Sequence, residues 1–277
     1  MAASAGRGVH GQTVEYIGRR IVTGELEEGA TIDVVALESE LDVSRTVVRE
    51  ALRVLAAKGL VGARQKRGTF VRPRVEWNLL DRDVLRWQWV ERTDAEFFEN
   101  LQEVRAIVEP AGARLAAQRR TAEDVAALEQ ALAAMAGAGD DPVAATRADL
   151  AFHRALLAAT HNELLLRMEA VIEAGLNVRD RLVHGALQVP DPVPTHREVF
   201  EAVRNRRPHK AERAMRALLD RAIADLRELT PEPMPPTSLP AVGPLWEPAG
   251  ADDDGWVSAD GGRDDRAADS GQPQAGG

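Results

Sequence analysis

Three titratable side chains in the second half of the chain have the spacing of a metal site. Asp149 and His153 are four residues apart, so on a helix both lie on the face that also carries Leu156. His196 shares a helical face with Val199 in the same way. A buried carboxylate needs a partner, and imidazole and carboxylate groups inside a helical bundle are typical ligands of a divalent ion. The same pattern also fits polar groups that satisfy one another in a core, so these residues alone leave both interpretations open.

Arg105 is the candidate for binding a small anion. It lies among apolar positions of a predicted helix, and a buried guanidinium needs a negatively charged partner. One such partner is Glu109, four residues further on. The other candidate partner is the carboxylate of an effector. Both pairings occur in turn if the effector competes with Glu109 for Arg105. Asn177 and Thr195 are candidates for further polar contacts with the effector.

A basic segment near the start of the chain indicates DNA binding. Residues 44–74 contain nine Lys and Arg residues and a single acidic residue. On the helix predicted after Ser44, three arginines at intervals of four form a stripe beside the apolar face, and arginine can bond O6 and N7 of guanine together. Hydroxyl groups at the helix start suit phosphate oxygens. A solvated basic face is the alternative. The candidate DNA-binding residues are Ser44, Arg45, Thr46, Arg49, Lys66, Arg67 and Gly68.

Periodicity and turn residues predict a mainly α protein with two domains. Helices near 14–21, at 34–41 and from Ser44 to Gly59, with strands at 60–63 and 69–72, form an N-terminal winged helix-turn-helix. An all-α helical bundle for ligand binding follows, with Pro190, Pro192 and Pro194 in a loop. Its predicted helices are 95–119, 122–136, 142–160, 163–187, 197–205 and 210–229. The predicted domains are 1–74 (DNA-binding), 75–83 (linker), 84–230 (effector and metal binding) and 231–277 (a disordered acidic tail).

Composition excludes several classes of protein. The chain of 277 residues has no cysteine, which rules out disulfides, thiolate metal sites and cysteine nucleophiles. It has no apolar run long enough to span a bilayer and no signal-like start, so we expect a cytoplasmic protein. The net charge of −9 conceals the basic segment and a tail, residues 231–277, with nine acidic and two basic residues. One hypothesis is that this tail competes with DNA for the basic segment.

The basic segment closely resembles the winged helix of GntR-family bacterial transcription regulators. The matching strings are LDVSRTVVREALRVLAAKGL at residues 41–60 and RGTFV at residues 67–71. The resemblance implies that Arg45 and Arg49 read bases and that Gly68 touches the minor groove. The preceding helix departs from the family pattern, because Asp33 and Val34 stand where a polar or basic residue is often found.

The helical segment resembles the FCD-type ligand-binding domain of the FadR subfamily. The strings are WNLLDRDVLRW (77–87), LQEVRAIVEPAGARLAA (101–117) and DLAFH (149–153). The resemblance implies a divalent metal ion bound by Asp149, His153 and His196. Zinc is the expected ion, although nitrogen and oxygen ligands do not distinguish zinc from nickel or manganese. Leu218 stands where metal-binding members have a further histidine. Three protein ligands would leave an open site, and the departure also fits a weak or lost site.

These observations predict a transcription regulator rather than an enzyme. We expect a repressor that binds a double-stranded DNA operator as a homodimer and responds to a small carboxylate effector, with a sugar acid favoured by the resemblance. A metal-dependent hydrolase or lyase would use the same three metal ligands, but it lacks a placed general base and leaves the basic segment unexplained. A ligand-independent architectural DNA binder would show little sequence preference.

Overall fold

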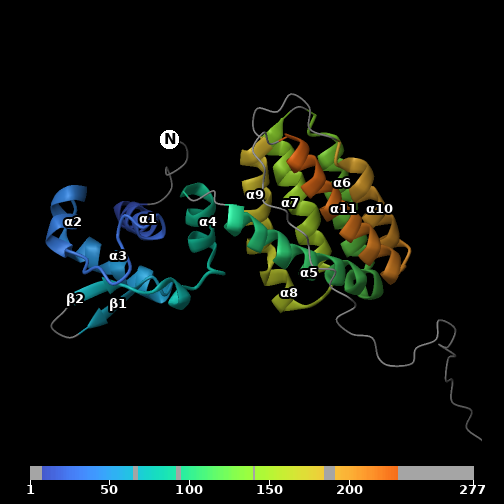
Figure 1. Cartoon of the computed structure of the whole chain (residues 1–277). Helices are drawn as coiled ribbons and strands as arrows, with labels where there is room; N and C mark the ends of the chain where they lie inside the picture. Colours follow the sequence, from blue (N-terminus) through green and yellow to red (C-terminus); the bar gives the residue numbers. More distant parts are fainter. Residues whose placement is uncertain (1–7, 65–67, 92–94, 140, 184–190, 230–277) are drawn as a thin grey trace, which may run out of the picture. The chain divides into compact units, whose positions relative to one another are not determined.

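The computed structural model describes residues 8–64, 68–91, 95–139, 141–183 and 191–229. The first part is a winged helix with a three-helix core and a two-stranded wing (Figure 1). Its elements are α1 (Val9–Val22), α2 (Val34–Leu41), α3 (Arg45–Ala57), β1 (Val61–Arg64) and β2 (Gly68–Val71). The strands are antiparallel with Val61 opposite Val71, and a bridge from Thr31 to Phe70 extends the pairing.

Local capping fixes where α2 and α3 begin. The Asp33 carboxylate accepts from the amides of Val35 and Ala36 at 2.9 and 3.1 Å, and the Ser44 hydroxyl accepts from the Val47 amide. Such caps satisfy amides that have no partner within the helix. Between the two helices, Asp42 adopts the left-handed conformation with φ of 50°, which makes the turn tight. The helix-turn-helix predicted for these residues is confirmed.

Helix α4 (Arg82–Glu91) follows a short 3₁₀ turn, η1 (Arg74–Glu76), and packs on two sides. The fully buried Trp87 joins the hydrophobic core of the winged helix, where it lies against Gly18 of α1. Arg86 of α4 donates to the Glu15 carboxylate at 2.7 Å. Leu85 belongs to a separate cluster with residues of α5 and α9, so one helix contributes to two cores.

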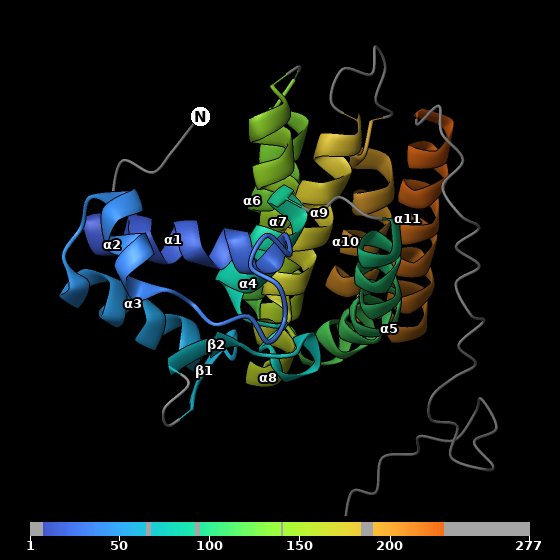
Figure 2. The same cartoon turned by 60° about the vertical axis from the view of Figure 1, so that its left-hand side comes forward.

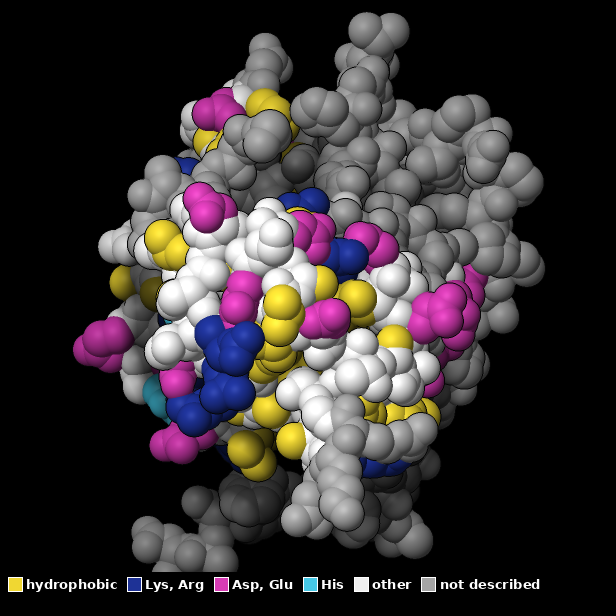
Figure 3. Space-filling view, turned by 90° about the vertical axis from the view of Figure 1, so that its left-hand side faces the viewer, with side chains coloured by type: hydrophobic (Ala, Val, Ile, Leu, Met, Phe, Trp, Pro, Cys, Tyr) yellow, Lys and Arg dark blue, Asp and Glu magenta, His cyan; other side chains and the backbone are white. Residues whose placement is uncertain are grey.

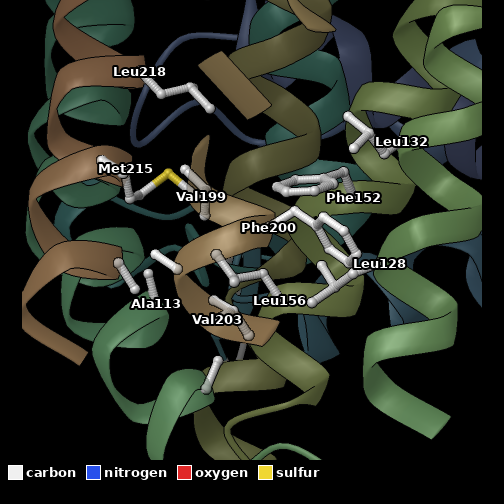
Figure 4. Packing of buried hydrophobic residues seen from close by; sticks show 14 of the residues in the cluster. Ala113, Leu128, Leu132, Phe152, Leu156, Val199, Phe200, Val203, Met215 and Leu218 are labelled. Carbon is white, nitrogen blue, oxygen red and sulfur yellow. The ribbon is translucent and has the colours of Figure 1, made fainter. Parts of the chain in front are cut away.

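The helical domain consists of long helices packed lengthwise (Figures 1 and 2). Neighbouring pairs include α5 with α11, α6 with α7, α10 with α11, and α7 with α9. Its main core is made of small and medium side chains with Phe152 and Phe200 at the centre (Figure 4). The helices are α5 (Ala95–Arg119), α6 (Ala122–Ala136), α7 (Pro142–Ala158), α8 (Glu163–Arg167), α9 (Glu169–Val183), α10 (Val193–Arg204) and α11 (Pro208–Leu229).

Several predicted boundaries are wrong, each for a local reason. The helix predicted at 163–187 is divided at Met168 into α8 and α9, and α7 ends at Ala158, before a left-handed residue at His161. Helix α10 begins at Val193, so Pro194 lies in its first turn, where proline loses no hydrogen bond. The linker predicted at 75–83 overlaps the start of α4, a helix missing from the predicted set. Residues 184–187, the end of the helix predicted at 163–187, and residues 230–277, which include the predicted tail, lie outside the described part of the chain.

Replacing Gly18 by alanine should destabilise the winged helix. A Cβ at this position would lie 2.4 Å from the Trp87 ring, which is fully buried and has no room to retreat. We expect the free energy of unfolding to fall by about 1–3 kcal/mol, as overpacked cores do. Urea unfolding monitored by fluorescence measures this free energy. Gly8→Ala, with no atom within 4 Å of the new Cβ, is the control; an equal effect in both variants would contradict the packing argument.

Candidate functional site

Helix α3 presents an exposed cationic face outside the winged-helix core. Val48, Leu52 and Leu55 are buried, whereas Arg45 and Arg49 are exposed. Arg45 donates through Nε to Glu38 of α2 at 2.7 Å. Figure 3 views this side of the winged helix, where Lys and Arg side chains gather beside acidic ones.

The three arginines of the predicted stripe are not equivalent. Arg53 forms an ion pair with Glu50, and Arg45 forms one with Glu38, whereas the described residues provide no ion pair for Arg49. Ser44 is committed to capping α3, and Thr46 is exposed beside it. Gly68 opens β2 with φ of +80°, the left-handed region that favours glycine. Lys66 and Arg67, the other predicted wing residues, lie outside the described residues.

A cavity of about 200 Å³ lies within the helical domain, between α5, α7, α9, α10 and α11. Eight of its twelve lining residues are polar or charged, although ligand pockets are usually lined mostly by apolar side chains. The lining residues are Arg105, Asp149, His153, Leu176, Asp191, Pro192, Thr195, His196, Leu218, Arg221, Ala222 and Asp225. The sequence-predicted metal ligands and the predicted effector arginine therefore meet in one cavity.

Asp149, His153 and His196 converge at the wall of this cavity. Their ligand atoms all lie within 4.8 Å of one another, and all three residues are buried. One oxygen of Asp149, Oδ1, lies 3.2 Å from Nε2 of His153 and 3.0 Å from Nε2 of His196. The edge of Phe152 packs against the His196 ring, with ring centroids 4.9 Å apart, which limits the rotation of that imidazole.

The hydrogen bonds of these residues fit a bound cation. Nδ1 of His196 lies 2.8 Å from the carbonyl oxygen of Pro192 and so carries the proton in the neutral ring. Nε2 then directs a lone pair at the Asp149 oxygen, and two acceptors at 3.0 Å repel unless a proton or a cation lies between them. A carboxylate and two imidazole nitrogens are a donor set that zinc accepts, with the second ring nitrogen held by a backbone carbonyl.

Glu109 connects the metal ligands to Arg105. Its carboxylate is fully buried, forms a close ion pair with Nδ1 of His153, and accepts from Nε of Arg105 at 2.6 Å. Arg105 thus contacts Glu109 through Nε while its side chain also lines the cavity. An effector carboxylate could therefore bind the outer edge of Arg105 without displacing Glu109.

Burial and charge act in opposite directions on the acids of this cluster. Burial raises the pKa of Glu109, but the charges of Arg105 and His153 outweigh it and lower that pKa to about 2. Burial likewise raises the pKa of Asp149, and the hydrogen bond with His153 holds that pKa well below its ordinary value. Both acids are therefore ionised in the folded protein at neutral pH.

His153 balances the two ionised acids. Burial lowers its pKa, but the charge of Glu109 and the hydrogen bond with Asp149 outweigh burial and raise that pKa to about 9. In the absence of a metal ion, His153 is therefore protonated on both ring nitrogens and positively charged at neutral pH. A metal ion that binds through this ring must displace one of these protons.

Other predicted site residues have different surroundings. Leu218 packs beside Met215 and Val199 in the main core (Figure 4), and it also lines the cavity. The Thr195 hydroxyl donates to the Pro192 carbonyl oxygen at 2.9 Å and faces the same cavity. Asn177 donates to the Glu173 carbonyl oxygen of its own helix and is absent from the cavity lining.

Sequence reasoning missed three lining residues. Asp191, Arg221 and Asp225 carry charge but belong to no short motif. The sequence contains a signal for Arg221 and Asp225. Residues 218, 221, 222 and 225 have the spacing of one helix face, and Leu218 stands at the position where a further histidine ligand is expected.

The winged helix and the helical domain that follows it are those of a DNA-binding transcription regulator. Residues 10–71 match the family described as "Bacterial regulatory proteins, gntR family", and residues 100–221 match the FCD domain. The chain belongs to the GntR family of bacterial transcription regulators and is not an enzyme.

Two relatives and one solved structure illustrate the similarity. The "Galactonate operon transcriptional repressor" of Escherichia coli is 35% identical over 77% of this chain and 95% of its own length. The "Probable D-xylose utilization operon transcriptional repressor" of Paenarthrobacter nicotinovorans is 30% identical over 75% and 84%. The solved structure described by "Lar controls the expression of the Listeria monocytogenes agr system and mediates virulence" has a TM-score of 0.59 at 16% identity. It covers 80% of this chain and 98% of that one, and it shows the fold alone.

Among the described residues, no helix is both long enough and apolar enough to cross a membrane.

The metal-free protein should lose stability as the pH rises from about 6.5 to about 9. The folded-state pKa of His153 lies above its unfolded value, so the stabilisation is complete below the unfolded pKa and disappears as pH passes through the folded one. We expect the free energy of unfolding to fall by roughly 1–3 kcal/mol in urea titrations with a chelator present.

Two comparisons make this pH experiment specific. His153→Gln should show a flatter profile over the same interval, because the titrating ring is gone. Zinc should bind more tightly as the pH rises, since its histidine ligands must be deprotonated. Metal-free native protein that is equally stable at pH 6.5 and pH 9 would contradict the charge balance described above.

Arg49→Ala should weaken specific DNA binding more than nonspecific binding. Loss of one bidentate contact to guanine costs about 1–3 kcal/mol, or roughly 10- to 100-fold in affinity. Fluorescence anisotropy with a duplex selected from a random library by the native protein measures it, beside a scrambled duplex. Arg213→Ala, an exposed arginine of the helical domain, should change affinity less than about twofold. Equal losses on both duplexes would exclude base reading by Arg49.

Proposed function

We propose that the protein is a repressor of an operon for sugar-acid use, controlled by a small carboxylate effector that binds beside a divalent ion. The observation that carries the proposal is the placement of Arg105 and the three potential metal ligands around one cavity. Two relatives support the effector class, because their names refer to galactonate and D-xylose operons.

The size of the cavity restricts the effector. A volume of about 200 Å³ corresponds to about seven water molecules at ~30 Å³ each. That space suits an acid of up to about six carbon atoms and is too small for a long acyl chain. The polar lining favours a ligand with several hydroxyl groups over an apolar one.

We propose zinc as the ion, held by Asp149, His153 and His196. A bound divalent ion supplies positive charge and an open coordination position at the cavity wall. The chain's own residues do the rest: Glu109 orients His153, the Pro192 carbonyl orients His196, and Arg105 offers its outer edge to a carboxylate. Leu218 supplies no ligand atom, so the protein contributes three ligands.

DNA binding by the proposed regulator requires two copies. A homodimer of the FadR type would place two α3 helices one helical turn apart on a palindromic operator. The effector controls DNA binding only if it binds the operator-competent arrangement and another arrangement with different affinities. Release of DNA on effector binding is the outcome expected of a repressor.

A thermal-shift experiment with Arg105→Ala tests this function. An aldonate at about 100 times its dissociation constant should raise the midpoint of zinc-loaded native protein by roughly 5–10 °C. The shift should vanish in Arg105→Ala and fall sharply after chelation, because both charges hold the carboxylate. Metal content measured by mass spectrometry establishes the loading.

Arg114→Ala is the matched control, since this arginine lies on the same helix outside the cavity lining. It should retain the full shift. Native protein that responds to no sugar acid or small hydroxy acid would overturn the proposed effector class, and binding that is independent of Arg105 would overturn the proposed site. Operator affinity that is insensitive to a bound acid would identify a ligand-independent DNA binder.

A further inference from the structure

Three further charged side chains of the cavity lining come from α11 and from the residue before the cap of α10. Asp191 precedes the first turn of α10, while Arg221 and Asp225 lie on α11 beyond Leu218. Helices α10 and α11 pack together after a short connection and run in opposite directions, so Asp191 and Asp225 lie toward the same end. Seven residues of helix separate Leu218 from Asp225, an axial distance of about 10 Å.

Asp225 is the unusual group at this end. Its side chain is 8% exposed, and Oδ1 is buried with no hydrogen-bond partner among the described residues. Nε of Arg221 lies 2.7 Å from that oxygen without hydrogen-bond geometry, and the Arg221 side chain is 61% exposed. A buried carboxylate oxygen whose ion pair lacks hydrogen-bond geometry keeps an unused acceptor position at the cavity wall, and a ligand hydroxyl can supply the donor.

The neighbouring charges favour a hydroxyl group over an ammonium group at this position. A hydroxyl group both donates and accepts, so it can bond the Asp225 carboxylate and the Arg221 guanidinium together. An ammonium group only donates, and it would lie beside the positive charge of Arg221. Asp191 adds a second acceptor at the same end, although one of its oxygens already accepts from the Val193 amide at 2.9 Å.

We propose that Asp225, supported by Arg221, is a specificity-determining residue that accepts a hydrogen bond from a distal hydroxyl group of a polyhydroxylated acid. The assignment rests on the proposed function, in which the carboxylate of the same acid binds at Arg105. On this assignment an extended acid of five or six carbons contacts both Arg105 and Asp225, whereas a three-carbon hydroxy acid contacts Arg105 alone. The site would therefore select acids by the length of their carbon chain.

Titration calorimetry of the zinc-loaded full-length protein tests the assignment. The probes are lactate, which has no distal hydroxyl, and the six-carbon acids D-galactonate and D-gluconate. Asp225→Asn should weaken binding of the better hexonate by roughly 10- to 100-fold, the range for a hydrogen bond to a charged group. Its affinity for lactate should change less than about twofold.

Two variants separate this assignment from its alternatives. Asp220→Asn, an exposed residue of the same helix, should bind all three acids as the native protein does. Arg105→Ala should lose lactate and hexonate together. The thermal midpoint of ligand-free Asp225→Asn should match that of the native protein within a few degrees, which shows that the domain is folded.

The outcomes distinguish failure of the Asp225 assignment from failure of the proposed effector class. Unchanged hexonate affinity in Asp225→Asn, or an equal loss of lactate and hexonate, would overturn the role of Asp225 and leave the effector site intact. Failure of the native protein to bind any of the three acids would overturn the proposed effector class and this assignment with it.

Discussion

The helical domain depends on the balance of charge around Glu109 and Asp149. Two buried carboxylates would be prohibitively costly alone, and the folded chain provides Arg105 and a protonated His153 to neutralise them. The four formal charges sum to zero. Replacing the His153 proton by a divalent ion makes the sum one positive charge, and the cavity then attracts an anion. In the proposed site, a metal ion and an effector would therefore be linked through the net charge of this cluster.

Three helices of the domain hold the members of this cluster. Glu109 and Arg105 are one turn apart on α5, Asp149 and His153 are one turn apart on α7, and His196 lies in the first turns of α10. Each pair is held on a rigid helix with apolar neighbours, so the ligand atoms are positioned before any ligand arrives. Leu218 belongs to the packed core of α11 and closes one side of this arrangement with an apolar surface.

Much of this organisation could be predicted from local sequence signals. The caps at Asp33 and Ser44 and the spacing of Asp149 and His153 are short-range features. The structure shows α2 and α3 where they were expected, and it brings Asp149 and His153 together with His196. The break at Met168 could not be predicted, because no glycine or proline marks it. Helical spacing places Asp225 on the same face as Leu218, but its position at the cavity also depends on α10 lying beside α11, a contact that no local pattern encodes.

The ion pair between Glu38 and Arg45 gives the recognition helix a built-in counterion. DNA affinity falls as salt rises because a cation that neutralises a phosphate releases counterions condensed on the DNA. Before Arg45 could contact DNA it would have to leave the fixed carboxylate of Glu38, whereas Arg49 has no ion-pair partner among the described residues. Adjacent arginines on one helix face would thus contribute unequally to DNA affinity, because a contact made by Arg45 replaces one that it already has.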